Sequence, residues 1–417
     1  MRSSDPSRNY RKLTSNFIAL SLVKATDYLV PLVTLPYIAR VIGVEKFGVI
    51  IFSQSFVQYF VSLVEYGFNF SGTRAVALHR DNRTELEALF SRIYVAKITL
   101  AIGGFSLFAI LTGVVPSLRE QALLHLLTFG LVFGEALLPT WFFQGMEQMQ
   151  FLTFLNGIAK FFFAAVLFLF VKSPDDFILV NLFYAAGAIM AGILGLILVV
   201  YSFGIRLCLP SVGSLIHELQ KGFPLFVSIF MPTLYNNTST FILGLSAPPT
   251  LVGYYAAAMK IINLVTQLIT VLSRVFYPFL SRHANDFSLI RRTLLGTGGV
   301  LAFLLITTAT PLVLLLFSNR FAPAIPLLRI LAVGIFMLSV MAAYGTNYLL
   351  VLQKDRLYMM LTLVASLVGF AATVILIPLW HHYGAAWTLT GTRTLLAILC
   401  FLSALHLMRK KPDSSET

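Results

Sequence analysis

Charged side chains are scarce in this chain of 417 residues, because Asp, Glu, Lys and Arg together make up only 11% of it. Soluble globular domains are about one-quarter charged. Hydrophobic residues make up 58% of the chain, and its mean hydropathy is +0.85. Apolar runs such as FFFAAVLFLFV recur, and a helix needs about 20 apolar residues to cross a bilayer. This composition excludes a water-soluble fold and predicts an all-α integral membrane protein.

The chain also lacks the residues of a disulfide framework or a metal site. Its two cysteines, Cys208 and Cys400, lie far apart, and neither belongs to a Cys-x-x-Cys pair. His381 and His382 are adjacent but have no third ligand nearby, so we interpret them as an interfacial turn. A GxxxxGK[ST] phosphate-binding loop is absent, which argues against ATP hydrolysis. We therefore predict no metal and no cofactor.

Apolar windows between charged or Pro- and Gly-rich breaks predict twelve transmembrane helices. The net charge of +13 is carried by short segments between these spans, not by a basic domain, so we predict no nucleic-acid partner. No loop is long enough for a separate catalytic domain, so we predict that the protein is not an enzyme. The predicted spans are 14–38, 47–70, 92–114, 121–145, 150–171, 177–203, 222–245, 252–280, 294–317, 326–350, 357–379 and 385–408.

Lysines and arginines outside the spans are unevenly distributed between the two sides. If the N-terminus is cytoplasmic, most of them fall on that side, many in the loops 74–91 and 204–220. These two loops are expected to be short amphipathic segments on the membrane surface. The positive-inside rule then predicts that both termini are cytoplasmic. The cations left on the other side are Arg40, Lys46, Arg119, Lys172 and Arg320.

The two halves of the chain resemble each other at an offset of about 205 residues, which places Gly48 over Gly253. The polar residues of the second and eighth spans then coincide: Gln58, Ser62, Glu65 and Asn69 match Asn263, Gln267, Thr270 and Arg274. Both sets have the spacing of one helical face. Such stripes could simply join helices, but their recurrence favours two six-helix lobes, 1–205 and 206–417, lining a common polar cavity.

Charged residues inside the predicted spans are mostly basic. The cations are Lys24, Lys97, Lys160, Lys260, Arg274, Arg329 and Arg393. The acids are Asp27, Glu65 and Glu135, all in the first half. Lys24 and Asp27 can pair with each other, and Lys97 and Lys160 could pair with Glu65 and Glu135. The second-half cations either snorkel to the interface or bind an anionic ligand such as a phosphate group.

Prolines interrupt the first span of each half. Pro31 and Pro36 lie in the first span, and Pro224 and Pro232 lie in the seventh, beside the run NNTST. Proline frees a backbone carbonyl and bends a helix, and interrupted helices at matching positions are typical of transporter sites. We expect these helices to form a gate.

Three segments resemble a known family. The run PYIARVIGVEKFGVIIFSQSFVQYFVSLVEYGFNFSGTRAVALHRDN (36–82) closely resembles the beginning of bacterial O-antigen flippases (Wzx), in the polysaccharide-export branch of the MOP superfamily. LPTWFFQGMEQM (138–149) and VGYYAAAMKIINLVTQLITVLSRVFYPFLSR (252–282) are similar to later segments of that family. The resemblance implies a MOP/MATE-like fold in the bacterial inner membrane. It also implies alternating access and transfer of an undecaprenyl-diphosphate-linked oligosaccharide to the periplasmic leaflet.

The implied partners are this substrate, membrane lipid, and a polysaccharide polymerase and chain-length regulator. The expected substrate-binding residues are Lys24, Lys97, Lys160, Lys260, Arg274 and Arg393. Asp27, Glu65 and Glu135 are candidates for ion coupling, and Gln58, Ser62, Asn69, Asn263, Gln267 and Thr270 are expected to line the cavity. The alternative function is a multidrug or organic-cation exporter of the same superfamily. A cation exporter should offer acids in its cavity, and this chain offers more bases.

Overall fold

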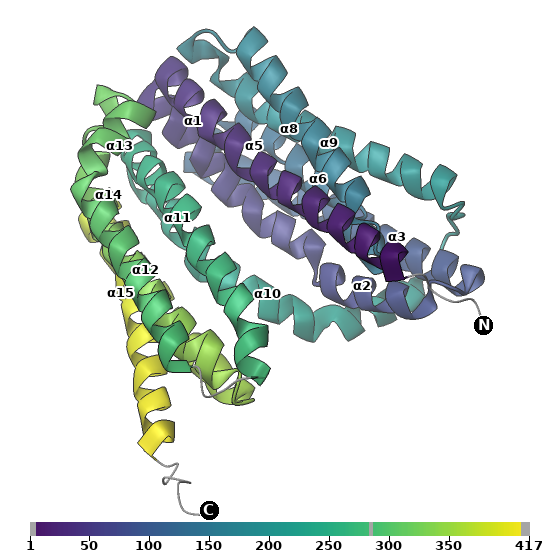
Figure 1. The fold of residues 1–417 in the computed structure, drawn as a ribbon. Helices are drawn as coiled ribbons and strands as arrows, with labels where there is room; N and C mark the ends of the chain where they lie inside the picture. The colour runs from purple at the N-terminus through teal and green to yellow at the C-terminus, as the bar shows by residue number, and fades with distance from the viewer. Residues whose placement is uncertain (1–5, 283–286, 410–417) are drawn as a thin grey trace, which may run out of the picture. The chain divides into compact units, whose positions relative to one another are not determined.

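The computed structural model describes residues 6–282 and 287–409, with most of the side chains from Val30 onward (Figure 1). All regular secondary structure in these two ranges is helical. The prediction of an all-α membrane protein is confirmed, because nine helices in the described ranges are long and apolar enough to cross a membrane.

The helices fall into two compact units. The first unit contains α1 up to Ile42 and residues Ser53–Thr233, and the second contains Gly43–Phe52 and the chain from Leu234 onward. Up to the middle of α10, the chain forms α1 (Pro6–Glu65), α2 (Phe68–His79), α3 (Arg83–Val114), α4 (Pro116–Arg119), α5 (Ala122–Thr128), α6 (Gly130–Leu137), α7 (Thr140–Gly145), α8 (Met149–Phe170), the short turn η1 (Pro174–Asp176) and α9 (Phe177–Ser202). From α10 onward it forms α10 (Val212–Ser246), α11 (Pro249–Arg282), α12 (Phe287–Thr307), α13 (Ala309–Leu316), η3 (Asn319–Phe321), α14 (Ala324–Met341), the π-helical segment η4 (Ala342–Leu349) and α15 (Asp355–Arg409).

These helices account for all twelve predicted spans. The first two spans lie in α1 and the beginning of α2, the last two lie in α15, and α10 supplies the seventh span. Within α1 the break is Gly43, with φ 79° and ψ 174°, a backbone conformation that glycine adopts without a steric penalty. Pro31 and Pro36 lie inside α1 without ending it.

The structure refines two of the predicted segments. The loop expected over 74–91 is largely helical, because α2 continues to His79 and α3 already begins at Arg83. The side chain of Asn82 accepts a hydrogen bond from the backbone N–H of Glu85, which caps the beginning of α3. The fourth span, predicted over 121–145, agrees with the apolar span Ala122–Gly145, but it is divided into α5, α6 and α7, and Pro139 separates the last two.

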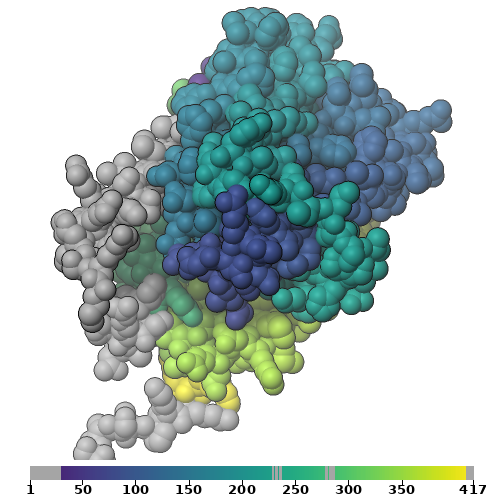
Figure 2. Space-filling view, turned by 90° about the vertical axis from the view of Figure 1, so that its right-hand side faces the viewer, coloured from purple at the N-terminus to yellow at the C-terminus, as the bar shows by residue number. Residues whose placement is uncertain are grey.

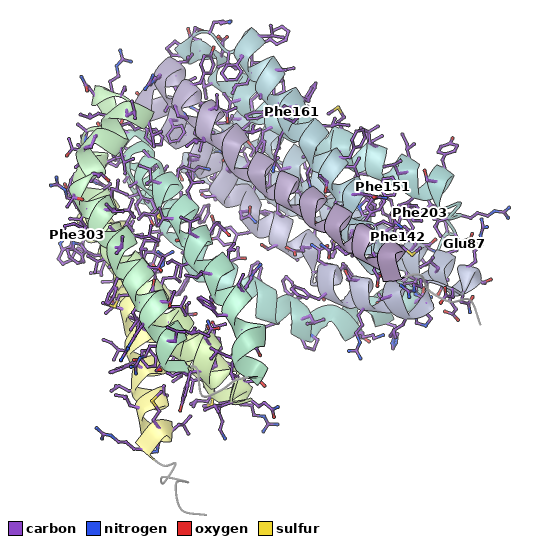
Figure 3. All side chains as sticks on the ribbon, viewed as in Figure 1. Glu87, Phe142, Phe151, Phe161, Phe203 and Phe303 are labelled. Atoms are coloured by element: carbon purple, nitrogen blue, oxygen red, sulfur yellow. The ribbon has the colours of Figure 1, made fainter. Side chains whose placement is uncertain are left out.

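Small residues allow close helix packing within the first unit. A Cβ atom on Gly134 of α6 would come within 2.6 Å of the Ala188 Cβ, and one on Gly192 of α9 within 2.5 Å of the Leu137 Cβ. Helices in a membrane gain stability mainly from such contacts, since lipid tails are as apolar as side chains. Where α9 ends, the rings of Phe142, Phe151 and Phe203 pack together, and the ring centroids of Phe142 and Phe203 lie 5.2 Å apart (Figure 3).

The second unit contains a close crossing of two helices. A Cβ atom on Gly48 would lie 1.9 Å from the Pro249 carbonyl oxygen, and one on Gly253 would lie 2.3 Å from that of Val44. Segment Gly43–Phe52 of α1 therefore crosses the first turns of α11 backbone against backbone. Gly48 and Gly253 are the two glycines that the internal repeat places in register.

Candidate functional site

Lys97 and Glu135 form an ion pair inside the first unit. The Nζ atom of Lys97 lies 3.2 Å from the Glu135 carboxylate and donates to the Glu135 backbone carbonyl at 2.7 Å. Lys97 is completely buried, whereas the side chain of Glu135 is 25% exposed. Of the pairings considered from the sequence, this is one that the structure forms. Lys97 is therefore neutralised by the protein itself.

Glu65 lies next to this pair, at the C-terminal end of α1. Its carboxylate accepts a hydrogen bond of 2.9 Å from the Asn69 side chain, and the charges of Glu135 and Lys97 both act on it. Two of the three predicted ion-coupling acids thus share one electrostatic cluster with Lys97. Glu65 and Asn69 are both partly buried.

The first-half polar stripe is largely engaged within its own unit. Ser62 is buried and its hydroxyl lies 3.2 Å from that of Thr233 on α10. The ring of Tyr66 stacks on Phe226 of α10, with centroids 4.8 Å apart. Gln58 is exposed. Ser62 of this stripe therefore helps to join α1 to α10, as expected if such residues only hold helices together, whereas Glu65 and Asn69 bond to each other.

The second-half stripe is different, because it lies on the surface of α11. Asn263, Gln267 and Arg274 are exposed, and Thr270 is partly buried, its hydroxyl donating to the Thr266 carbonyl. Lys260 lies one turn before Asn263 on the same face and is partly buried. Within the described part of the chain, Lys260 and Arg274 have neither a hydrogen bond nor an ion pair. We define Lys260, Asn263, Gln267, Thr270 and Arg274 as the polar edge of α11.

Arg393 lies elsewhere in the second unit, on α15. It packs against Gly334 of α14, where a Cβ atom would come within 3.4 Å of the Arg393 Cδ. Its charge acts on the buried hydroxyl of Tyr255. Next to it, Thr390 donates to the Ile330 carbonyl at 3.2 Å. Arg393 is thus held among α11, α14 and α15 and is not part of the exposed face of α11.

Three remaining predicted residues are less informative. Lys160 is partly buried on α8. Lys24 and Asp27 belong to α1, but their side chains lie outside the described part of the structure.

A buried polar network in the first unit was not predicted from the sequence. Ser53 donates to Thr128 at 2.8 Å, Asn181 donates to the same hydroxyl at 2.8 Å, and Gln54 donates to Asn181 at 2.8 Å. The His125 ring lies 3.0 Å from the Ser53 hydroxyl. Polar residues near the middle of several spans were a signal for it, but spacing along the chain does not reveal contacts between helices.

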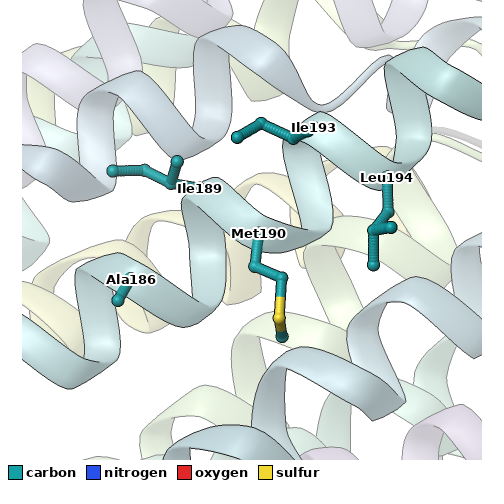
Figure 4. Close-up of a pocket in the computed structure, with 5 residues that line it drawn as sticks. All are labelled: Ala186, Ile189, Met190, Ile193 and Leu194. Atoms are coloured by element: carbon teal, nitrogen blue, oxygen red, sulfur yellow. The ribbon is translucent and has the colours of Figure 1, made fainter.

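One pocket in the first unit is apolar. It lies on α9 and is lined by Ala186, Ile189, Met190, Ile193 and Leu194 (Figure 4). None of the predicted site residues contributes to it. Among the described residues, no group of three or more His, Cys, Asp and Glu side chains could hold a metal ion.

The chain matches a polysaccharide biosynthesis family and is similar to two proteins named as O-antigen transporters. A family model described as "Polysaccharide biosynthesis protein" matches residues 13–284. A protein of Escherichia coli (strain K12) named "Putative O-antigen transporter" is 28% identical over 408 residues, covering 96% of this chain and 97% of that protein. A protein of the same name from Shigella dysenteriae is 27% identical over 276 residues, covering 65% and 68%.

Solved structures share the fold at low sequence identity. The lipid II flippase MurJ in an inward closed conformation gives a TM-score of 0.75 at 13% identity, covering 94% of this chain and 87% of that one. An inward-facing multidrug resistance MATE family transporter of the MOP superfamily gives a TM-score of 0.64 at 11% identity, covering 96% and 99%. These structures establish a MOP/MATE-like fold.

Proposed function

Because the chain belongs to the polysaccharide biosynthesis protein family, whose model matches residues 13–284, we propose that it is a flippase for a lipid-linked oligosaccharide. Its substrate is an undecaprenyl-diphosphate-linked repeat unit of O-antigen or a related polysaccharide. The resemblance seen in the sequence is confirmed by two relatives named as O-antigen transporters. The relatives are transporters and flippases, so the prediction that the chain is not an enzyme is also confirmed.

The polar edge of α11 is the observation that carries this proposal. A diphosphate is a compact dianion, and Lys and Arg donors bind phosphate oxygens through charge-assisted hydrogen bonds. Lys260 and Arg274 offer such donors without a protein partner in the described residues, and Asn263 and Gln267 add neutral donors between them. Arg393, held inside the same unit, adds positive potential. A face of this kind favours an anionic head group over an organic cation.

We propose that the substrate crosses through a cationic cavity by alternating access, in the bacterial inner membrane with both termini cytoplasmic. A polymerase and a chain-length regulator are proposed downstream partners. Lys24 and Lys160 remain proposed substrate ligands. For Lys97 we now propose a structural role, because its charge is already neutralised by Glu135 at 3.2 Å.

Ion coupling is assigned to the acids of the first half. Glu65 and Glu135 form one cluster, so a proton or cation taken up there acts on both. Asp27 is proposed as a further coupling site, since a diphosphate competing for Lys24 would leave this carboxylate without its partner. The alternative is a structural Lys24–Asp27 pair that only fixes helix packing.

The test is a deletion strain complemented with variants. Loss of the gene should accumulate undecaprenyl-linked repeat units on the cytoplasmic side. Arg274→Ala or Arg393→Ala should abolish surface polysaccharide at a normal protein level, and Lys at either position should partly restore it. The matched control is Arg292→Ala, which removes an exposed arginine at the beginning of α12 and should leave polysaccharide unchanged.

Two other results would count against the proposal. Unchanged glycolipids together with altered drug tolerance would support the multidrug exporter. Normal polysaccharide in both alanine variants would mean that neither arginine binds the substrate.

A further inference from the structure

The exposed surface of α11 carries a second stripe beside the polar edge. Four apolar residues each follow a polar-edge residue directly in the sequence, so the two stripes run side by side, about 100° apart around the helix. We call this stripe the apolar edge, and it consists of Leu264, Leu268, Val271 and Val275. Leu268, Val271 and Val275 are 57%, 51% and 64% exposed.

The corresponding stripe of the first half is covered. Subtracting the repeat offset from the apolar edge gives Tyr59, Leu63, Tyr66 and Phe70. Tyr66 is buried against Phe226 of α10, and the Tyr59 ring lies 6.4 Å from that of Phe230 on the same helix. Tyr59 and Leu63 are partly buried, and Phe70 is exposed. The apolar edge of α11 therefore remains open where most of its repeat counterpart is occupied by protein.

Neither of the two simple environments of a membrane helix accounts for both edges together. A face that meets only acyl chains gains nothing from Lys260 and Arg274, because charges in hydrocarbon are costly. A face that lines only a water-filled passage gains nothing from the exposed aliphatic side chains of Leu268, Val271 and Val275, because their contact with water is unfavourable. An amphiphile whose charged group is bonded directly to a long apolar chain satisfies both edges at once.

We propose that α11 binds the polyprenyl diphosphate part of the substrate along both edges. This inference rests on the proposed function and adds where the lipid chain lies. The polar edge holds the diphosphate, and the apolar edge holds the isoprene units next to it. The apolar edge extends over about 16 Å along the helix axis, since each residue rises by 1.5 Å. That length is about half of the hydrocarbon core, so only the first isoprene units lie on it.

The test compares two diphosphates that differ only in chain length. Undecaprenyl diphosphate and dimethylallyl diphosphate, which has one isoprene unit, are bound to the full chain in nanodiscs of zwitterionic lipid, and their dissociation constants are measured with wild type and variants. Leu268→Ser combined with Val271→Ser removes the middle of the apolar edge. The matched control is Leu363→Ser with Leu367→Ser on α15, since these leucines are 45% and 60% exposed. Comparison within one nanodisc composition removes the contribution of lipid partitioning.

We expect the double α11 variant to weaken undecaprenyl diphosphate binding about tenfold while dimethylallyl diphosphate binding changes little, because a single isoprene unit is too short to reach the middle of the apolar edge. The Leu268→Met, Val271→Ile variant should retain the wild-type ratio, and the α15 control should too. If the serine variant left the ratio of the two dissociation constants unchanged, this inference alone would be overturned. The same holds if phosphatidylglycerol competed with undecaprenyl diphosphate as well as unlabelled undecaprenyl diphosphate does. If neither diphosphate bound wild type more tightly than Arg274→Ala, the proposed function would fail as well.

Discussion

Lys97 is a fully buried cation that the protein neutralises itself. Its Nζ atom meets both the carboxylate and the backbone carbonyl of Glu135. The cations of the α11 polar edge have no such partner among the described residues. At the scale of single residues, burial and pairing thus separate structural cations from candidate ligands, although both kinds look alike in the sequence.

Lys97→Ala should destabilise the protein strongly. It would leave Glu135 without its counter-charge, and breaking a buried ion pair by removing one partner costs about 3–5 kcal/mol. The measurement is unfolding of the purified protein in detergent. Lys172→Ala, at an exposed lysine, is the control and should change stability by less than about 0.5 kcal/mol. Replacing both partners with Lys97→Met and Glu135→Gln should recover most of the loss, and equal stability of Lys97→Ala and wild type would contradict the structural role.

The crossing of α1 and α11 relates the internal repeat to the packing. The sequence predicted that Gly48 and Gly253 occupy equivalent positions, and the structure brings these two positions into contact. Two helices related by a repeat can touch backbone to backbone only where neither carries a side chain. The glycines are therefore explained by the approach of the two segments and not by flexibility.

Gly48→Ala should disrupt this crossing. The added Cβ would lie 1.9 Å from the Pro249 carbonyl oxygen, which is backbone and cannot move away cheaply. We expect a loss of about 1–3 kcal/mol, typical of overpacking, seen as a lower unfolding midpoint and lower export. Gly103→Ala is the matched control, because nothing lies within 4 Å of its Cβ position inside α3. That variant should be neutral or slightly more stable, and an equally neutral Gly48→Ala would refute the crossing.

The spans could be predicted from the sequence because hydropathy alone determines them. The continuity of α1 through Gly43 could not, since a single glycine allows either a loop or a kink. The division of the fourth span at Pro139 was missed because the mean hydropathy of the span stays high across this proline. The polar edge of α11 was found by its spacing. The same spacing gave no sign that Ser62 would be covered by α10, because covering depends on tertiary contacts.

Whole-molecule orientation depends on which basic segments lie at the same end. In the first unit, Arg83 donates to the Gly204 carbonyl at 2.6 Å, and the backbone N–H of Arg206 donates to Glu87 at 3.3 Å. Arg92 pairs with Glu218 at 3.7 Å. The beginning of α3 and the segment after α9 therefore lie together, as the space-filling view of this end also shows (Figure 2).

The segment around η1 lies at the other end of the same unit. It joins the C-terminal end of α8 to the beginning of α9, and α9 runs 26 residues to Ser202 before the chain reaches the basic segment. A helix of that length extends about 39 Å, which is enough to cross the bilayer. The contacts of the first unit thus place residues near 81 and near 175 at opposite ends of that unit, and we predict that they lie on opposite sides of the membrane.

The positive-inside rule then predicts that residues near 81 are cytoplasmic and residues near 175 periplasmic. In a variant without Cys208 and Cys400, Asp175→Cys should react with an impermeant thiol reagent added to intact cells. Asp81→Cys should react only after the cells are opened, because the turn between α2 and α3 carries Arg80 and Arg83 and is predicted to be cytoplasmic. Both aspartates are exposed, so a lack of reaction reports sidedness and not burial. If position 81 but not position 175 were labelled from outside, the orientation would be opposite to the predicted one. The proposed transfer from the cytoplasmic to the periplasmic leaflet would then be contradicted as well.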